Sequence, residues 1–162
     1  MKTLIVYFSK FGNTRRIAET IAEVMRQAGE ARVVSIDRLA ASDFERADLV
    51  VVGSPTHAFT VPPAVRSILD AQPAGILAGK SVAAFDTTVK PWPLRLMRAS
   101  PKLLRQLQKL GGNLIAGPRT FFVKTSKTQQ SGEVDLLLEG EIERARQWAG
   151  EILDKSKALV KA

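Results

Sequence analysis

The chain has 162 residues, of which 45% are hydrophobic, and a formal net charge of +8 at pH 7. This length suits one domain spanning residues 1–162, and no apolar run reaches the roughly 18–20 residues that a membrane-spanning helix needs. The absence of cysteine excludes disulfides, thiolate catalysis and cysteine-ligated metal sites, and the single histidine argues against a histidine-rich metal site.

Apolar runs alternate with helical patterns along the chain. Strands are expected at residues 4–8, 32–36, 49–52, 81–85 and 113–123, the last one bent at 117–118. Helical patterns follow the turn at 9–14 and are also expected at 42–46, from 62–63 onward, at 101–110 and at 139–155. This alternation predicts an α/β fold with a doubly wound parallel sheet and helices on both faces.

Three loops with unusual chemistry follow the first, third and fourth expected strands. They cover residues 9–14, 54–59 and 86–93. In a doubly wound sheet, ligands bind outside the carboxyl ends of the strands, at the point where the strand order reverses. The fold is therefore expected to bring these three loops together into one site.

The loop at residues 9–14 has the composition of an anion site. The first backbone N–H groups of the following helix are unpaired, and together with the positive end of the helix dipole they favour an anion. Ser9 and Thr14 add hydroxyl groups, Asn13 adds an amide, and Gly12 lets the backbone approach a ligand closely. Neither Gly-x-Gly-x-x-Gly nor Gly-Lys-Ser/Thr is present in this loop. A phosphate is the expected ligand; the alternative is a plain strand–helix turn capped by Thr14.

The pattern aromatic–x–Ser–x–x–Gly–x–Thr–x–x–x–Ala–x–x–aliphatic resembles the phosphate loop of the flavodoxin family. Its positions are filled here by Tyr7, Ser9, Gly12, Thr14, Ala18 and Ile21. The resemblance covers essentially the whole chain and implies a five-stranded flavodoxin-like sheet of order 2-1-3-4-5 that binds flavin mononucleotide (FMN). The cofactor-binding residues that it implies are Ser9, Lys10, Phe11, Gly12, Asn13, Thr14, Ser54, Pro55, Thr56, His57, Phe59, Asp86, Thr87, Thr88 and Trp92.

The resemblance places the phosphate at residues 9–14 and the flavin ring between the second and third loops. Thr56 and the backbone around His57 would hydrogen-bond the polar edge of the ring, and residues 86–88 would face its pyrimidine end. Phe59 is either a ring cover or a core residue, and Trp92 either stacks on the ring or anchors its loop. His57 is interpreted as a spectator rather than a proton donor.

The two ring loops depart from the flavodoxin pattern. Flavodoxins are usually acidic and often carry glycine and acidic residues in these loops. This chain has His57-Ala58 in the second loop and Lys90-Pro91-Trp92-Pro93 in the third. Positive charge near the ring favours the reduced, anionic flavin and raises its potential. This argues against a very low-potential carrier and leaves room for an enzyme.

The basic excess lies in the middle of the chain. Residues 61–130 hold 11 Lys/Arg and 2 Asp/Glu, a net charge of +9, whereas residues 1–60 have a net charge of +1 and residues 131–162 of −2. Arg95, Arg98, Lys102 and Arg105 recur at helical spacing within it. They form either a solvated helix face or a docking surface for an acidic redox partner. A nucleic-acid motif is lacking, so the sequence does not favour that partner.

The leading hypothesis is an FMN-binding, flavodoxin-like electron-transfer protein with no catalytic side chain of its own. One alternative is an NAD(P)H-dependent quinone or flavin reductase of the same fold. The other is a flavin-free module that binds an acidic partner. The lack of a second nucleotide motif favours a carrier over a stand-alone oxidoreductase. The absence of cysteine, with no room for a signal peptide before the first strand, favours the cytoplasm.

Overall fold

The structure is a computed structural model that describes residues 1–57, 60–90, 98–125 and 134–161. Phe59, Trp92 and Arg95, which the sequence singled out, lie outside the described residues. The strands are β1 (Lys2–Tyr7), β2 (Glu30–Ser35), β3 (Leu49–Pro55), β4 (Ser81–Val89), β5 (Asn113–Leu114) and β6 (Arg119–Val123). The α-helices are α1 (Asn13–Met25), α2 (Ala41–Glu45), α3 (Pro63–Asp70), α4 (Ala99–Lys109) and α5 (Glu141–Lys161).

The strands form one parallel sheet of order β2-β1-β3-β4-β5, which confirms the predicted doubly wound topology. The fifth strand is divided into two pieces that both pair with β4. Asn113 lies opposite Ser81 in β5, and Arg119 lies opposite Phe85 in β6. Residues 115–118 separate the two pieces, so the expected bend near Gly117 is a break in the ladder.

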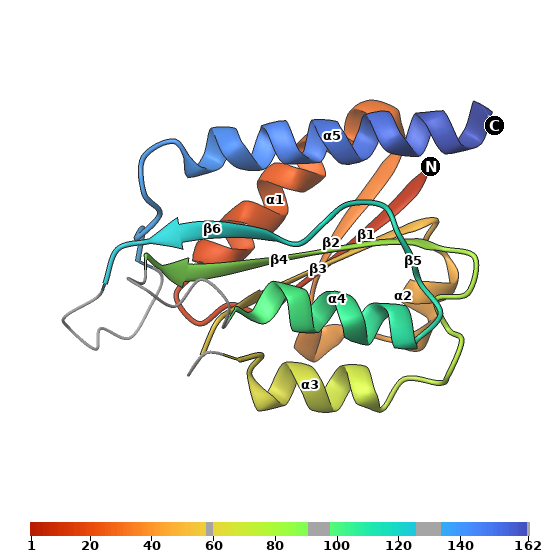
Figure 1. Ribbon diagram of the computed structural model, residues 1–162, viewed down its shortest axis with the longest axis horizontal. Coiled ribbons are helices and arrows are strands. Elements are labelled where there is room, and N and C mark those ends of the chain that lie inside the picture. Colours follow the sequence, from red (N-terminus) through yellow and green to blue (C-terminus); the bar gives the residue numbers. More distant parts are fainter. Residues whose placement is uncertain (58–59, 91–97, 126–133, 162) are drawn as a thin grey trace.

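Helices cover both faces of the sheet, as predicted. Figure 1 shows α1 and α5 on one face and α3 and α4 on the other. Successive residues of β1 alternate between the two cores: Ile5 packs on the α1 and α5 side, whereas Leu4 and Val6 pack on the opposite side. Because both faces are buried, β1 and β3 read as continuous apolar runs rather than as alternating ones.

Three predicted boundaries were wrong at the end of the sheet that carries the loops. Ser54 and Pro55 were expected in a loop, but β3 continues to Pro55 because both residues pair with β4. Residues 86–89 were expected in a loop, but β4 continues to Val89 because β6 pairs alongside it as far as Val123. Ser100 was expected as the N-cap of α4, but it lies within the first turn of a helix that begins at Ala99. In addition, α5 continues to Lys161, beyond the expected end near Lys155.

None of the helices in the described ranges has the length and apolar character that crossing a bilayer requires.

Candidate functional site

A cavity of about 320 Å³ opens at the carboxyl end of the sheet. Its walls come from the loop after β1, the first turn of α1, the ends of β3, β4 and β6, and the segment before α5. The predicted site residues that line it are Ser9, Lys10, Phe11, Asn13, Thr14, Pro55, Thr56, His57, Thr87 and Thr88. The three predicted loops therefore do meet, and the cavity lies where the strand order reverses between β1 and β3.

One end of the cavity carries hydrogen-bond donors that suit an anion. Gly12 is the N-cap of α1 and has a left-handed backbone with φ of 86°, a conformation that favours glycine. Glycine has no side chain to cap the helix, so no side-chain cap bonds the first N–H groups of α1. The Ser9 hydroxyl is buried and has no hydrogen-bond partner within the described structure. Free N–H groups and an unpaired hydroxyl at one helix N-terminus match the requirements of a phosphate.

The Thr14 hydroxyl connects this end of the cavity to the sheet. It lies 2.8 Å from the Thr87 hydroxyl, and both residues are buried. This contact holds the first turn of α1 against the end of β4, and either of the two hydroxyls can be the donor in it. A ligand oxygen near Thr14 would therefore meet a hydroxyl that already has a fixed partner.

Asn13 has a structural partner that sequence spacing does not reveal. Its amide nitrogen donates to the Val134 carbonyl at 2.9 Å, and its amide oxygen accepts the Leu136 N–H at 2.9 Å. The Val134 N–H in turn donates to the Phe11 carbonyl at 3.0 Å. Both ends of the Asn13 amide are thus used to fasten the loop at 9–14 to the segment before α5.

Asp86 is placed at the start of α4 rather than on the cavity wall. Its carboxylate is fully buried, and Oδ2 accepts the Thr56 hydroxyl at 2.9 Å and the Ser100 N–H at 3.1 Å. The Thr56 hydroxyl also accepts the Ala99 N–H at 3.0 Å. These two side chains satisfy the first N–H groups of α4, which is why the helix begins before Ser100.

Gly12 and Ser54 also lie outside the residues that line the cavity. Ser54 is buried within β3, and its hydroxyl donates to the Pro55 carbonyl at 2.9 Å. Five lining residues were missed by the sequence reasoning: Val89, Val123, Lys124, Thr125 and Leu136. Most of them come from β6 and the segment before α5, which only the pairing of β6 with β4 brings to this edge.

His57 lines the cavity and is solvent-exposed. Partial burial, and secondarily the charge of Lys10, lower the pKa of His57 below its ordinary value. Its backbone N–H and carbonyl pair with Thr60 at 3.0 and 2.8 Å. The imidazole is therefore predominantly neutral at pH 7, in a turn fixed by two backbone hydrogen bonds.

The donors at Ser9 and α1 fit the phosphate of a mononucleotide, and the apolar side chains of Pro55, Val89, Val123 and Leu136 fit a flat aromatic ring. A doubly wound sheet that gathers hydrogen-bond donors suited to an anion at its reversal point is an arrangement on which many α/β proteins bind nucleotides. The model of the flavodoxin domain family matches residues 4–114, and the chain belongs to this family. FMN is the cofactor of flavodoxins.

The chain is similar to a flavodoxin from Clostridium saccharobutylicum, at 29% identity over 89 residues that make up 54% of this chain and 56% of that protein. A flavodoxin from Aquifex aeolicus (strain VF5) is 38% identical over 58 residues, 35% of this chain and 31% of that protein. The matches thus span about half, or less, of these curated relatives. Oxidised flavodoxin 2 from Bacillus cereus superposes with a TM-score of 0.77 at 22% identity, covering 96% of this chain and 99% of that chain. At this identity the superposition shows the fold.

Proposed function

We propose that this chain binds FMN in the cavity at the carboxyl end of the sheet and passes electrons through the flavin to a redox partner protein. The observation that carries the proposal is the buried Ser9 hydroxyl, which lacks a partner within the described structure beside the uncapped N-terminus of α1. The bound flavin supplies the electron-transfer chemistry, and the protein binds it, orients it and tunes it.

In this proposal the phosphate is held by the Ser9 hydroxyl, the Thr14 hydroxyl and the N–H groups that follow Gly12. The ring lies between the turn at 55–57 and the end of β4 at 87–89, where Thr87 and Thr88 offer polar groups. Asn13 and Asp86 act indirectly, because Asn13 fastens the phosphate loop and Asp86 holds the start of α4. Contacts of Phe59 and Trp92 with the ring stay predictions.

Two observations favour an electron carrier over the two alternative functions, a stand-alone reductase and a flavin-free module. A stand-alone reductase would need a second site for NAD(P)H, and the sequence has no dinucleotide motif. In a flavin-free module, the buried Ser9 hydroxyl would stay without a hydrogen-bond partner in the described structure and would only destabilise the fold. Steady NADPH–quinone turnover by the pure protein would replace the carrier with the reductase.

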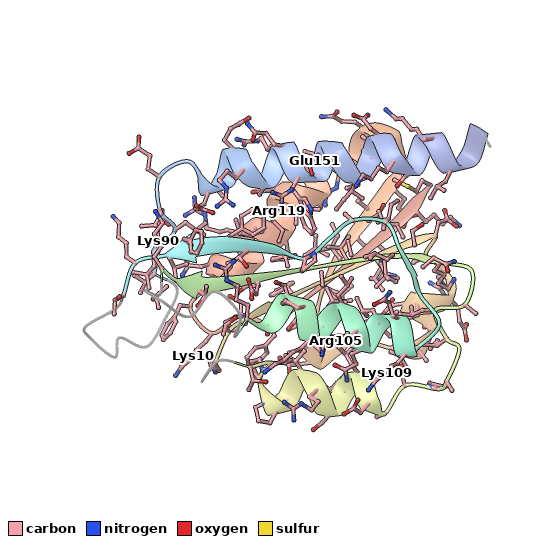
Figure 2. All side chains as sticks on the ribbon, viewed as in Figure 1. Lys10, Lys90, Arg105, Lys109, Arg119 and Glu151 are labelled. Carbon is pink, nitrogen blue, oxygen red and sulfur yellow. The ribbon has the colours of Figure 1, made fainter. Side chains whose placement is uncertain are left out.

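We further propose that the partner is acidic and docks on the basic face of α4, and that both proteins are cytoplasmic. Arg105 and Lys109 line a groove between α3 and α4 together with Arg66 and Lys102. Figure 2 shows Arg105 and Lys109 along α4, which begins near the cavity. Arg98 is partly committed to the fold, since it donates to the Thr120 hydroxyl at 3.1 Å. Arg95 belongs to the same predicted set.

The proposal is tested by titrating the purified protein with FMN and with riboflavin, which lacks the phosphate, while flavin fluorescence is recorded. We expect FMN to bind more tightly than riboflavin. Ser9→Ala should weaken FMN binding about tenfold or more and leave riboflavin binding unchanged, because a hydrogen bond to a charged group contributes about 1.5–3 kcal/mol. Ser67→Ala, on the exposed face of α3, is the matched control and should change neither affinity.

Two outcomes would contradict the proposal. Equal losses for FMN and riboflavin in Ser9→Ala would mean that residues 9–14 do not hold the phosphate. Unchanged fluorescence of both flavins with the wild-type protein would mean that the cavity does not bind flavin.

A further inference from the structure

We propose that Lys10, Lys90 and Lys124 form a cationic rim around the flavin ring, here called the lysine rim. The lysine rim makes the chain bind the reduced, anionic flavin more tightly than the oxidised, neutral flavin and so raises the midpoint potential of the bound cofactor. This inference rests on the proposed FMN site and deepens it, because it concerns which redox state that site prefers.

The three lysines come from three different loops that meet at the cavity. Lys10 and Lys124 line it, one after β1 and the other after β6. Lys90 directly follows Val89, which ends β4 and also lines the cavity. Figure 2 shows Lys10 and Lys90 at the same end of the molecule, where the arrowheads of β4 and β6 end. Two of the three lysines therefore line one opening, and Lys90 lies one residue beyond its lining.

Lys10 and Lys90 are exposed, and the ammonium group of each lies over an aromatic ring. Lys10 Nζ lies 5.3 Å from the centroid of the Phe11 ring, and Phe11 itself lines the cavity. Lys90 Nζ lies 5.7 Å from the centroid of the Phe122 ring in β6. Cation–π contacts of this kind hold a charge in place at a partly exposed site. The backbone of Lys124 is held by its N–H bond to the Leu136 carbonyl at 2.7 Å.

No carboxylate is among the described residues that line the cavity. Asp86 adjoins the lining residue Thr87, and its carboxylate is buried against the start of α4. Asp135, beside the lining residue Leu136, is paired with Arg16 at 2.5 Å. His57 is predominantly neutral at pH 7, since burial and Lys10 lower its pKa. The charged side chains that line the cavity in the described structure are therefore cationic.

The charge of the ring changes with its redox state, whereas the charge of the phosphate does not. Uptake of two electrons from a reductant such as dithionite and of one proton from water gives the neutral oxidised ring a net charge of −1. Nearby cations lower the energy of this anion relative to the neutral ring. A lysine that contacts only the phosphate would strengthen the binding of both redox states equally and leave the potential unchanged. The two roles can therefore be separated by experiment.

The test compares two triple variants by their dissociation constants for oxidised FMN and for FMN reduced with dithionite. The rim variant is Lys10→Gln, Lys90→Gln and Lys124→Gln. The control variant is Arg26→Gln, Lys155→Gln and Lys157→Gln. It removes the same charge from exposed positions far from the cavity, because Arg26 directly follows the C-terminus of α1 and the two lysines lie in the C-terminal turns of α5.

In the rim variant we expect the preference for reduced over oxidised FMN to fall about tenfold or more, which is about 30 mV for a two-electron couple. The control variant should change this preference much less, and riboflavin should show the same fall as FMN. In the wild-type protein, raising the ionic strength from about 0.05 to 0.5 M should lower the potential, because salt screens exposed charges.

Equal weakening of both redox states in the rim variant would overturn the inference and assign the lysines to the phosphate. An unchanged preference, or a fall seen with FMN but not with riboflavin, would also overturn it. These results all require that the wild-type protein binds flavin. Failure of the proposed function is recognised separately, because the wild-type titration would then show no binding in either redox state.

Discussion

At the scale of single residues, Gly53 shows how closely the sheet and the core are fitted. A Cβ atom added at Gly53 would lie 2.0 Å from Cζ of Phe85. The Phe85 ring cannot move aside easily, because it packs edge to face against Phe121 and Trp148 with centroid separations of 5.9 and 6.1 Å. Only glycine therefore allows β3 to pass beside this aromatic cluster.

We predict that Gly53→Ala lowers the free energy of unfolding by about 1–3 kcal/mol, the usual cost of overpacking a core. The measurement is urea denaturation followed by circular dichroism. Gly150→Ala in α5 is the matched control: nothing lies within 4 Å of its added Cβ, and it should raise stability by about 0.5–1 kcal/mol. A Gly53→Ala protein as stable as the wild type would show that Phe85 has room to shift.

The hydroxyls of Ser9 and Thr14 should differ in what they contribute to the stability of the flavin-free protein. Thr14→Ala removes a hydrogen bond to the Thr87 hydroxyl and should cost about 1 kcal/mol in flavin-free protein, while Thr14→Ser should restore most of it. Ser9→Ala removes a buried hydroxyl without a partner in the described structure and should cost nothing in flavin-free protein. Thermal unfolding of both variants with and without FMN distinguishes the effect of Thr14→Ala from that of Ser9→Ala. A loss of stability in flavin-free Ser9→Ala would mean that this hydroxyl has a partner in the folded protein.

Sequence reasoning identified most of the polar groups of the site but not their partners. The hydroxyl, amide and glycine of residues 9–14 are recognisable because they adjoin one another in the chain. The use of Asn13 depends on Val134 and Leu136, 121 and 123 residues away, and local spacing carries no trace of such a contact. Lys124 was likewise missed because only the pairing of β6 with β4 brings it to the cavity.

At the scale of elements, strand and helix order was predictable because apolar periodicity records which faces are buried. The residues at which elements begin and end were less predictable from the sequence. The sequence Asp86-Thr87-Thr88 looks polar and loop-like, yet it is strand because β3 and β6 pair with it on both sides. The start of α4 was displaced in the same way, since distant Asp86 and Thr56 satisfy its first N–H groups.

The stability of the short helix α2 should depend on pH through the carboxyl group of Asp43. The N–H of Ala40, and secondarily the charge of Arg32, hold the pKa of Asp43 below its ordinary value near 3.8. The folded state therefore favours the carboxylate, so this stabilisation is complete above the unfolded-state pKa and is lost as the pH falls through the lower folded-state pKa.

We predict that Asp43→Asn lowers the free energy of unfolding by about 1 kcal/mol at pH 7, as for other losses of a helix-start contact. The difference from wild type should shrink as the pH falls below about 4, because the carboxyl of the unfolded state then takes up a proton while the folded state still favours the carboxylate, and it vanishes below the lower folded-state pKa. Urea denaturation of both proteins at pH 7, 5 and 3 measures this difference in the free energy of unfolding. Glu45→Gln, an exposed position at the end of α2, is the control. A difference that stays constant with pH would contradict the role assigned to the charge of Asp43.

At the scale of the whole molecule, the formal net charge of +8 should govern encounters with charged reaction partners. We predict that the flavin-loaded, reduced protein is oxidised faster by an anionic oxidant such as ferricyanide as the ionic strength is lowered. A cationic cobalt(III) hexaammine oxidant should show the opposite dependence. Stopped-flow absorbance at several salt concentrations measures both rates. The same salt dependence for the two oxidants would show that long-range charge does not steer the reaction.

The arrangement of the whole molecule explains why one edge of the sheet carries the site. Two cores on opposite faces of a single sheet hold the strands rigidly, and the loops after β1, β3 and β4 are gathered where the order reverses. We propose that the whole chain unfolds as one domain, because the two cores share this sheet. The fold therefore fixes where the site lies, and the side chains of these loops decide what the site binds.

Binding of FMN in this cavity through its phosphate is best tested by titrating the flavin-free protein with FMN and riboflavin in parallel. We predict that FMN binds more tightly than riboflavin, and that Ser9→Ala removes most of that advantage without changing the affinity for riboflavin. Equal affinities for the two flavins in the wild-type protein, or no binding of either, would contradict it.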